Sequence, residues 1–579
     1  MSKTPNYDSK VKEILDATEP GERVCELTGE KWQMTQEEIG WYKKFNVPPS
    51  KRSPLTRMKQ LVSFYIMYQF WYQTHPETGK QFVSAIHPNS GFKALPDQEW
   101  YAKDFLDNNS VVNAQTSLLD QLVTLQKNVP LPGTKFIKEP VNSIVLASMG
   151  DVNSYFNLAC RSKNSLFSVD SFDIENCSEI SASTQIKNSF HVVQSHRLYK
   201  VRFALQCLDC MECDFIFDCH NCSYCFGATN KRNRQYIWFN EQLSKEDWEQ
   251  KHAEVNLGCR SNLESWKLKF TSLMKEQTIF PESFKEHCTN VVGDYMNNAT
   301  DCKYVVNGID GPFRNIYYGT YLYDNSYDCA FVAAPVAANN IYCTNTAVSS
   351  ANVKFCHTVK DSQNMEYCIY CYNCENCFAC VGLQRKKFCI LNKQYSEEGY
   401  WQKVDELKCA MLDRGEYGEP LPLSLLLVYP LYCGAPIIYM SDADEMKKLG
   451  ARVYEPESMG AAGPEPDMDK VVQTNAIPDC IDGLSDEWIN KPIFDEGFNR
   501  KFAFIKPEID FYRAQKLAPA NVHFVKRVLD LIQEQGSAVF FETNCSQCNK
   551  SIISTKNKHY PERKIYCRDC YLKYLEQYG

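Results

Sequence analysis

The sequence is poor in the residues and motifs on which most enzymes depend. It has only ten histidines among 579 residues, and it contains no G-x-S-x-G, H-E-x-x-H, P-loop or dinucleotide-binding fingerprint. We therefore expect a chain that is not an enzyme. Four of the histidines, His191, His196, His220 and His357, occupy outward positions of the repeat described below, where we expect solvent around them.

Long uninterrupted apolar runs are also missing. Residues 1–8 are polar, so we do not expect a signal peptide there. The most apolar stretch, residues 421–440, is interrupted by Pro422, Pro430, Gly434 and Pro436, whereas a membrane helix needs about 20 mostly apolar residues and tolerates proline poorly. We expect a buried, strand-like segment there, no membrane partner, and a cytoplasmic protein in a reducing compartment.

Charge is nearly balanced, and cysteine is abundant. The formal net charge of −8 argues against electrostatic binding of nucleic acid or membranes by the whole chain, although it leaves a local basic patch open. The 28 cysteines are too many for a typical cytosolic enzyme, and the chain is too long for a small secreted domain held by disulfides. The hydrophobic content of 44% is that of ordinary globular protein.

A six-residue period is the clearest positive pattern. In steps of six from Ser165 to Cys225, ten of eleven positions are Ser or Cys, and the positions three residues later are mostly aliphatic. The pattern returns between Ser326 and Cys380. Burial of every third residue fits neither an ordinary strand nor an α-helix. It predicts a narrow β-solenoid of about 12 residues per coil, similar in geometry to beetle antifreeze proteins, with a wider triangular coil of about 18 residues as the alternative.

Asn and Asp mark the predicted corners of these coils, because both tolerate left-handed backbone. They precede the inward residue at Asn176, Asp209, Asp218, Asn221, Asp328, Asn373 and Asn376. A cluster of tyrosines at Tyr317, Tyr318, Tyr321 and Tyr323 either faces a partner or packs against the solenoid.

The solenoid cysteines resemble a cluster-binding run, but their register indicates another role. Iron–sulfur motifs need a fourth ligand at a defined spacing, often followed by Pro, and no such Pro follows Cys213 or Cys380. Ser, Thr and Val share the same register, so we interpret these cysteines as small, slightly apolar core residues. Disulfides between coils, or metal inside the solenoid, remain alternatives.

Both repeat segments end alike, in a Gly, a basic turn, an aromatic strand and a helix start. Ser244 with Asp247 resembles a capping box, and Ser396 is followed by Glu397 and Glu398 in the first helical turn. We expect these helices to cap the open solenoid ends, with a ligand-binding role for the repeated turn as the alternative.

The C-terminal segment, residues 536–579, carries the strongest site motif. Cys545 and Cys548 form one C-x2-C pair, Cys567 and Cys570 form another, and residues 549–566 separate the pairs. Four thiolates fill a tetrahedral Zn²⁺ shell, which predicts one structural zinc and no catalysis by it. Six basic residues surround the pairs, namely Lys550, Lys556, Lys558, Arg563, Lys564 and Arg568. They form either a solvated surface or a contact for nucleic-acid phosphate.

A second duplication flanks the two repeat segments. Residues 38–43 match residues 508–513, and Pro49 with Pro519 and Arg57 with Arg527 keep the same offset of 470. The segment Cys-Glu-Leu-Thr-Gly, residues 25–29, precedes the first copy. We interpret the two copies as versions of one small module.

On these motifs, nearly the whole chain resembles a family of uncharacterised Cys-rich proteins of candidate-phyla-radiation bacteria and giant DNA viruses. That family pairs zinc ribbons with Cys-repeat segments and a final ribbon. Its ribbons read C-x2-C-G, an E-[LI]-x-[FW]-Y helix, then P-x-x-C-P-x-C-R. Cys25 matches the first ligand, but Thr28, Ser53 and Thr56 stand at the others, and the second copy has only Asp495 near the first position. The resemblance implies two ribbon folds that lost their metal, and it implies no activity.

We therefore predict a mainly β fold with helical caps (α+β), in which two narrow β-solenoids are flanked by zinc-ribbon-like modules. The predicted parts are a degenerate ribbon-like module (1–62), a linker or helical region (63–141), solenoid 1 (142–243), a helical connector (244–287), solenoid 2 (288–395), a helical cap with an apolar extended region (396–480), a second degenerate ribbon-like module (481–535) and the zinc ribbon (536–579).

The predicted function is that of a non-enzymatic scaffold with protein partners in a larger assembly, for example a virion or minor capsid component. The first alternative is binding of RNA or a ribonucleoprotein through the basic ribbon. The second alternative is an enzyme similar to β-helix acyltransferases, which place their small inward residue two positions from the aliphatic one rather than three.

Overall fold

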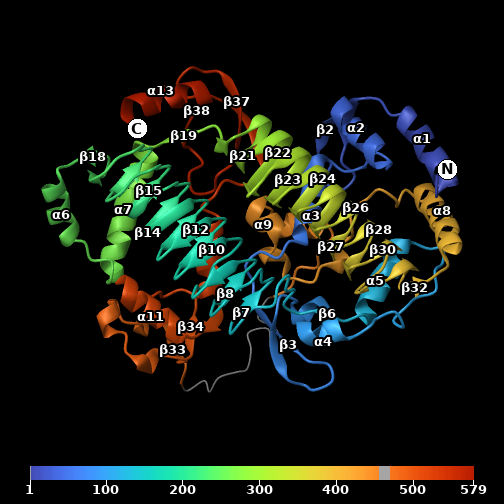
Figure 1. Ribbon diagram of the computed structural model, residues 1–579, viewed down its shortest axis with the longest axis horizontal. Helices are drawn as coiled ribbons and strands as arrows, with labels where there is room; N and C mark the ends of the chain where they lie inside the picture. The colour runs from blue at the N-terminus through green and yellow to red at the C-terminus, as the bar shows by residue number, and fades with distance from the viewer. Residues whose placement is uncertain (1, 456–469) are drawn as a thin grey trace.

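Two long stacks of parallel strands dominate the computed structural model, which describes residues 2–455 and 470–579 (Figure 1). This is a strand-rich mixed fold, and its long parallel sheets are consistent with β-solenoids. The first stack contains β7 (Ile144–Leu146), β8 (Tyr155–Leu158), β9 (Arg161–Lys163), β10 (Phe172–Glu175), β11 (Ser178–Ser181), β12 (Thr184–Lys187), β13 (Phe190–Val193), β14 (His196–Leu205), β15 (Met211–Phe217), β16 (Phe226–Thr229), β17 (Ile237–Trp238) and β18 (Glu241–Gln242).

The second stack is built in the same way, and the connecting segment 243–284 separates it from the first. It contains β20 (Lys285–Glu286), β21 (Thr289–Asn297), β22 (Ala299–Ile309), β23 (Phe313–Tyr323), β24 (Ser326–Val336), β25 (Asn339–Val348), β26 (Ala351–Lys354), β27 (His357–Lys360), β28 (Gln363–Glu366), β29 (Ile369–Tyr372), β30 (Glu375–Phe378), β31 (Lys387–Ile390) and β32 (Lys393–Gln394).

Strand registers give the length of each turn, and the predicted narrow coil is confirmed. In the first stack Thr184 pairs with His196, so one turn of the chain takes 12 residues. In the second stack Asn339 pairs with Ala351 and Ala351 with Gln363, which is the same turn length. Shorter turns of 11 residues occur where the first stack starts, and Ala299 pairs with Phe313 across a slightly longer turn. The wider triangular coil does not occur in either stack of the described chain.

The corners follow from left-handed residues at every third position. Asn176, Glu179, Ala182, Gln185 and Asn188 have φ angles between 48° and 58°. The seven predicted Asn and Asp corners all have positive φ, from 47° to 58°. The residue after each corner points inward, as Cys177, Ile180 and Ser183 show with no exposed surface. A repeated left-handed residue is unfavourable alone, so the ladder of parallel hydrogen bonds must hold it in place.

The inward Ser residues satisfy the backbone of the turn that follows. Ser195 Oγ donates to the carbonyl of Val193 at 2.9 Å and accepts the N–H of Cys207 at 3.0 Å, one turn further along. Cysteine replaces serine in the later turns, where Cys210 Sγ donates to the carbonyl of Leu208 at 3.3 Å. The stack cysteines are free thiols and buried, apart from the half-buried Cys288. Their interpretation as core residues therefore agrees with the described structure, in which no disulfide links two coils.

Helices follow the last strands of both stacks, as expected. Helix α6 (Lys245–Ala253) begins after Ser244, whose Oγ accepts the N–H of Asp247 at 3.0 Å. Helix α8 (Glu397–Asp413) begins after Ser396, whose Oγ accepts the N–H of Gly399 at 3.2 Å. Helix α7 (Arg260–Glu276) and β19 (Ile279–Pro281) then lead from the first stack to the second.

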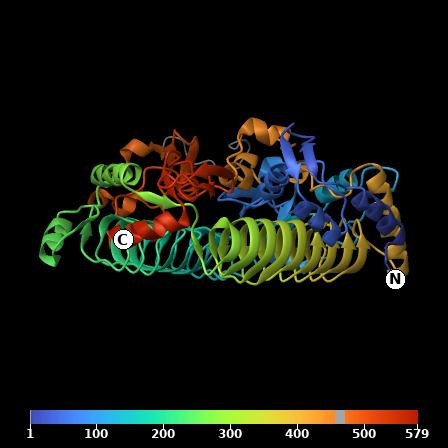
Figure 2. The ribbon, with the colours of Figure 1, turned by 90° about the horizontal axis from the view of Figure 1, so that it is seen from above.

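The two stacks lie side by side and run in opposite directions (Figure 1). Gln194 donates to Asn307 Oδ1 at 2.6 Å, and the rings of Phe172 and Tyr323 lie 5.4 Å apart, so turns of one stack contact turns of the other. Most helices and hairpins cover one long side, and the other long side is bare (Figure 2).

Before the first stack, the covering elements are α1 (Pro5–Asp16), β1 (Gly21–Val24), β2 (Lys31–Met34), α2 (Gln36–Phe45), α3 (Pro54–Ser63), β3 (Trp71–Thr74), β4 (Gln81–Ser84), η1 (Pro88–Ser90), β5 (Ala94–Leu95), α4 (Asp97–Ala102), α5 (Leu118–Asn128) and β6 (Leu131–Pro132). After the second stack they are η2 (Leu423–Leu425), η3 (Pro430–Tyr432), α9 (Gly434–Ile438), α10 (Ala443–Lys448), β33 (Val472–Gln473), η5 (Thr474–Ala476), η6 (Ile481–Gly483), η7 (Asp486–Trp488), β34 (Ile493–Asp495), β35 (Arg500–Phe502), α11 (Lys506–Gln515) and α12 (Phe524–Ile532).

The structure corrects two expectations from the sequence, for the histidines and for residues 421–440, and it decides between the two alternatives for the tyrosine cluster. The four stack histidines do face outward, but His357 is buried under the neighbouring elements, and His191, His196 and His220 are half-buried rather than solvated. The tyrosine cluster packs inside the molecule, and Tyr317, Tyr321 and Tyr323 are buried. Residues 421–440 are mostly buried as expected, but they form short 3-10 turns and α9 instead of a strand.

Candidate metal centre

The predicted cysteine quartet comes together at one point. Strands β36 (Phe540–Asn544) and β37 (Ser551–Thr555) form a hairpin whose turn carries Cys545 and Cys548. Strand β38 (Lys564–Tyr566) leads to Cys567 at the start of α13 (Arg568–Tyr578), and Cys570 follows in its first turn. The four sulfur atoms all lie within 4.8 Å of one another, and Cys548 Sγ is 3.7 Å from Cys567 Sγ.

These distances suit a tetrahedral metal. A Zn–S bond of about 2.3 Å places the sulfurs of a tetrahedron about 3.8 Å apart. The quartet therefore could hold a metal ion such as zinc. All four ligand positions are protein thiols, so a bound ion would have no open coordination site for a substrate.

Backbone amides stabilise the thiolate that a metal requires. Burial alone would raise the pKa of Cys545, but N–H groups of Cys567, Cys548 and Gln547 point toward its sulfur and lower the pKa to about 6. The Cys567 N–H donates to Cys545 Sγ at 3.2 Å. The same turn is closed by the N–H of Asn549, which donates to the carbonyl of Cys545 at 2.9 Å.

The cysteine-bearing module docks on the first stack and the connector. Strand β38 pairs in parallel with β19, with Phe280 opposite Ile565. Tyr571 on α13 donates to the buried carboxylate of Asp218, and Asn230 donates to the Tyr571 hydroxyl at 2.9 Å. The cysteine quartet is thus joined to the first stack through β38, which leads directly to Cys567, and through α13, which contains Cys570.

The basic residues around the quartet divide into two sets. Arg563 is half-buried, and it donates to backbone carbonyls of Tyr560 and Thr555 with its guanidinium 5.6 Å from the Phe280 ring centroid. The other five are exposed, but Lys558 and Lys564 are engaged with Gln533 Oε1 and the carbonyl of Glu276. Lys550, Lys556 and Arg568 remain as the most accessible cations.

One thiol and two hydroxyl groups lie close together in the first of the two duplicated modules. Cys25 Sγ lies 3.5 Å from Thr56 Oγ1, and Ser53 Oγ lies 3.0 Å from Thr56 Oγ1. Burial would raise the pKa of Cys25, but hydrogen bonds from Thr28, Thr56 and the backbone of Ser53 lower it to about 7. Hydroxyls and one thiol therefore occupy positions that the family resemblance assigns to metal ligands.

Two further hairpins have a turn in which backbone N–H groups donate to a side chain at the start of the turn. Residues 71–84 form the β3–β4 hairpin, in which the N–H groups of Glu77 and Thr78 donate to His75 Nδ1 at 3.1 and 3.2 Å. In the β34–β35 hairpin the N–H of Phe498 donates to Asp495 Oδ1 at 3.1 Å. The His75 hairpin was not anticipated from the sequence, although its Thr78-Gly79 matches Thr28-Gly29 of the first module.

The duplicated residues form two equivalent buried triads. In the first copy Tyr42 donates to Glu38 Oε1 at 2.6 Å, and Arg57 also bonds to that oxygen. In the second copy Tyr512 and Arg527 both donate to Glu508 Oε1, each at 2.9 Å.

Each triad arginine also lies on a ring of a stack. The guanidinium of Arg57 is 3.8 Å from the Phe331 centroid in the second stack, and that of Arg527 is 4.9 Å from the Phe167 centroid in the first. Arg527 additionally bonds to Glu179 of the first stack at 2.9 Å. The duplication therefore reflects a common way of docking a module on a stack.

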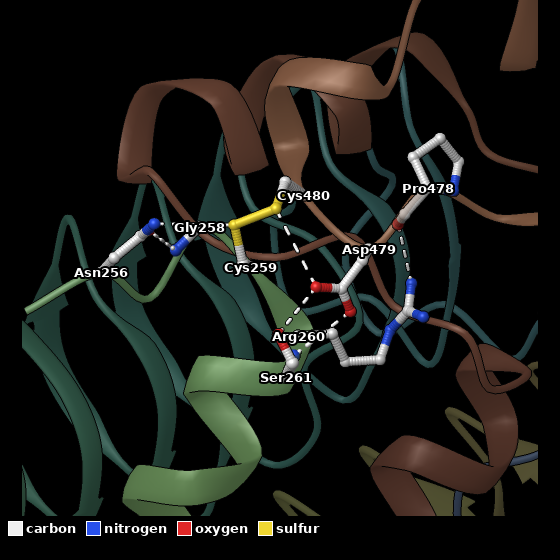
Figure 3. Close-up of a disulfide and its surroundings, with 8 residues drawn as sticks. All are labelled: Asn256, Gly258, Cys259, Arg260, Ser261, Pro478, Asp479 and Cys480. Carbon is white, nitrogen blue, oxygen red and sulfur yellow. Dashed lines mark hydrogen bonds between the residues drawn. A yellow bond between two sulfur atoms is a disulfide. The ribbon is translucent and has the colours of Figure 1, made fainter.

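One disulfide joins distant parts of the chain (Figure 3). Cys259 at the start of α7 bonds to Cys480, 221 residues away. Asp479 Oδ2 accepts from Ser261 Oγ at 2.8 Å, and Arg260 donates to the carbonyl of Pro478 at 2.9 Å. The sequence offered no signal for this pair, because both cysteines lie outside the repeats and the C-x2-C motifs. Both residues are half-buried, in contrast to the buried thiols of the stacks.

Comparisons with known proteins identify no relative. No family model matches the chain, and no curated protein matches it. Among solved structures, it matches a protein named "putative acetyltransferase" from Desulfovibrio desulfuricans G20, with 9% identity over 48% of this chain and 81% of that chain. The TM-score of 0.09 is too low to support an argument about fold or activity. Within the described residues, no helix combines the length and the apolar character needed to span a membrane.

Proposed function

We propose that the protein is a non-enzymatic, zinc-stabilised β-solenoid scaffold that acts as a structural or assembly component of a large particle, such as a minor capsid component of a virion. The observation that carries this proposal is the bare long side of the paired stacks (Figure 2). A repeating surface of this length suits binding to other proteins along a line, as solenoid proteins commonly do.

The outward side chains of the stacks support this proposal because they form regular ladders. Asn142, Asn153, Asn164 and Asn176 each donate to the asparagine one turn later, and the ladder ends at Asn188, which accepts. The same ladder recurs in the second stack at Asn340, Asn352, Asn364 and Asn376. Their regular spacing gives the protein a rigid, periodic exterior.

Charge pairs along this exterior are internally balanced. Arg161 pairs with Asp173 at 2.7 Å, and Arg197 pairs with Asp209 at 2.6 Å, each one turn away. A surface whose charges already have partners attracts free phosphate weakly. This favours a protein partner over nucleic acid on that side.

Binding of RNA or a ribonucleoprotein through the C-terminal module is the second candidate. It is favoured by Lys550, Lys556 and Arg568, which lie exposed within the cysteine-bearing module. Three cations are fewer than the six that the sequence suggested, so we rank this function second. An activity like that of β-helix acyltransferases stays a third, weaker hypothesis.

The finer assignments are part of the same proposal. We assign the ion in the cysteine quartet as one structural Zn²⁺, and we place the protein in the cytoplasm, with packaging into a particle as an extension. The family resemblance to Cys-rich proteins of candidate-phyla-radiation bacteria and giant DNA viruses is consistent with such a role. A half-buried disulfide is unusual for a reducing compartment, so the redox state of Cys259 and Cys480 in the native protein bears directly on the location.

Native purification tests the proposal. The protein would be isolated from its source at low and at high salt, and the material that sediments with it would be identified as protein or nucleic acid. A scaffold stays with a protein particle at high salt, whereas phosphate contacts weaken steeply as salt rises. Recovery of the protein alone at both salts, or with RNA that is lost at high salt, would contradict the scaffold proposal.

A further inference from the structure

A largely apolar cavity lies where the two stacks meet. Its volume is about 90 Å³, and its apolar lining includes Phe64, Leu158, Phe172, Ala334 and Val348. By comparison with an engineered cavity of about 150 Å³ that takes up benzene, it has room for roughly four non-hydrogen atoms. None of the residues that line the cavity belongs to the cysteine-bearing module.

Two lysines line this cavity, and in the described structure only one of them has an acceptor: Lys360 donates to the carbonyl of Ile137 at 3.1 Å. Lys135 lines the cavity and is 7% exposed. Within the described residues its amine has no hydrogen-bond acceptor or ion-pair carboxylate, and its nearest compensation is the ring of Tyr370, with Nζ 4.8 Å from the centroid. Burial lowers the pKa of Lys135 to about 7, against a smaller opposing effect from Asp97. A buried ammonium without a counter-charge is costly.

A second polar group on the same wall is also unsatisfied. Asn345 lines the cavity, is 1% exposed, and its Nδ2 has no hydrogen-bond partner in the described structure. Its Oδ1 is already used, at 3.2 Å from His357 Nδ1 and 3.0 Å from Thr346 Oγ1. Buried amide donors are rarely left unpaired. An unpaired amine and a buried, unpaired amide therefore both belong to residues that line one small, largely apolar space.

We propose that this cavity is a binding site for a short-chain monocarboxylate, whose carboxylate pairs with Lys135 and Asn345 and whose alkyl group occupies the apolar part. A carboxylate supplies both the missing charge for the amine and an acceptor for the amide. The apolar lining and the small volume exclude larger or multiply charged anions. Binding at this site would be independent of the scaffold function.

Ligand binding by the full-length protein provides the test, with propionate as the probe and thermal shift and ligand-observed NMR as the readouts. Propionate is expected to bind saturably, more strongly than 1-propanol or propylamine of the same size, and more strongly than hexanoate. The Lys135→Met variant keeps the aliphatic stem and is expected to bind propionate at least about tenfold more weakly, a factor that equals about 1.4 kcal/mol. The surface variant Lys187→Met is the matched control and is expected to bind normally.

The Ala334→Val variant keeps the test decisive if Lys135→Met does not fold, because it reduces the cavity and leaves the amine in place. Loss of propionate binding in this variant would support the site. Three results would overturn it: no propionate binding to the parent protein, unchanged binding in Lys135→Met or Ala334→Val, or equal binding of 1-propanol, which would indicate only an apolar void.

Discussion

Replacing Arg57 by alanine should destabilise the docking of the first module strongly. The Arg57 and Glu38 side chains are both 1% exposed, so removing the guanidinium leaves a buried carboxylate with only the Tyr42 hydroxyl as a described partner. Breaking a buried ion pair in this way costs about 3–5 kcal/mol. Loss of the contact with the Phe331 ring adds roughly 1–2 kcal/mol. We therefore expect a total cost of about 4–7 kcal/mol.

An exposed pair in the first stack is the matched control. Arg197 and Asp209 also form an arginine–carboxylate pair, at 2.6 Å, but their side chains are 51% and 44% exposed. Such pairs contribute about 0–1 kcal/mol. Arg197→Ala should therefore leave stability nearly unchanged, although it removes the same chemical group from the same kind of partner.

The assay must report on the module itself, because a chain of this size need not unfold in a single step. Hydrogen exchange of peptides from α2 and α3, together with urea midpoints, would measure local and global opening. In Arg57→Ala we expect faster exchange in α2 and α3 with little change in the distant first stack. The docking argument would fail if Arg57→Ala cost no more than Arg197→Ala, or if exchange rose equally throughout the chain.

Three further predictions address the cysteine quartet, the stack core and a half-buried histidine. The purified chain should hold about one zinc per molecule, and Cys545→Ser should lose it and speed exchange in α13; a zinc-free parent of unchanged stability would contradict the site. Ile216 has no exposed surface, so Ile216→Ala should lower the free energy of unfolding in urea by about 2–5 kcal/mol. A decrease of less than about 1 kcal/mol would contradict a packed interior. Burial would lower the pKa of His191, but Glu534 and Glu179 raise it to about 9. The folded pKa exceeds the unfolded value of about 6.5, so protonated His191 with its two glutamates stabilises the folded protein by up to about 3 kcal/mol. This stabilisation is complete below about pH 6.5 and is lost as the pH rises through 9. His191→Gln should remove the pH dependence between these values, and an unchanged pH profile would contradict it.

The repeat could be predicted from the sequence because its cause is local. A left-handed residue at every third position turns the chain, and the next side chain must then point inward. Asn176 before Cys177 and Asp209 before Cys210 show both parts of this rule in adjacent residues. The register of small and aliphatic residues therefore predicts the coil length, and no information about distant contacts is needed.

The cysteine quartet could be predicted for a similar reason. Each C-x2-C pair sits in one tight turn or helix start, and only the meeting of the two pairs requires the tertiary fold. The hairpin at His75 could not be predicted, because it contains no C-x2-C pair. In this hairpin two backbone N–H groups of the turn donate to His75 Nδ1. Many types of side chain could accept such hydrogen bonds, so the sequence carries no specific signal for the turn.

The environment outside the coils could not be predicted, since it depends on contacts across hundreds of residues. His357 has an outward register in its own turn, yet the ring of Phe64 lies 5.1 Å from its ring. Tyr321 likewise accepts from Gln535, 214 residues later. A period within the sequence shows which side chains leave the coil, but it does not show what covers them.

The two triads show how the duplicated modules attach to the stacks. Cys25, Ser53 and Thr56 lie together in the first module, where Arg57 bonds to Glu38 and also lies on a ring of the second stack. Arg527 does the same on the other stack, with Glu508 and Phe167. The residues that dock the modules on the stacks are thus present in both copies. Because the described docking contacts are made by the triads, they need no bound ion. The C-terminal module is the informative contrast, since it combines a complete cysteine quartet with docking through β38 and α13 rather than through a triad.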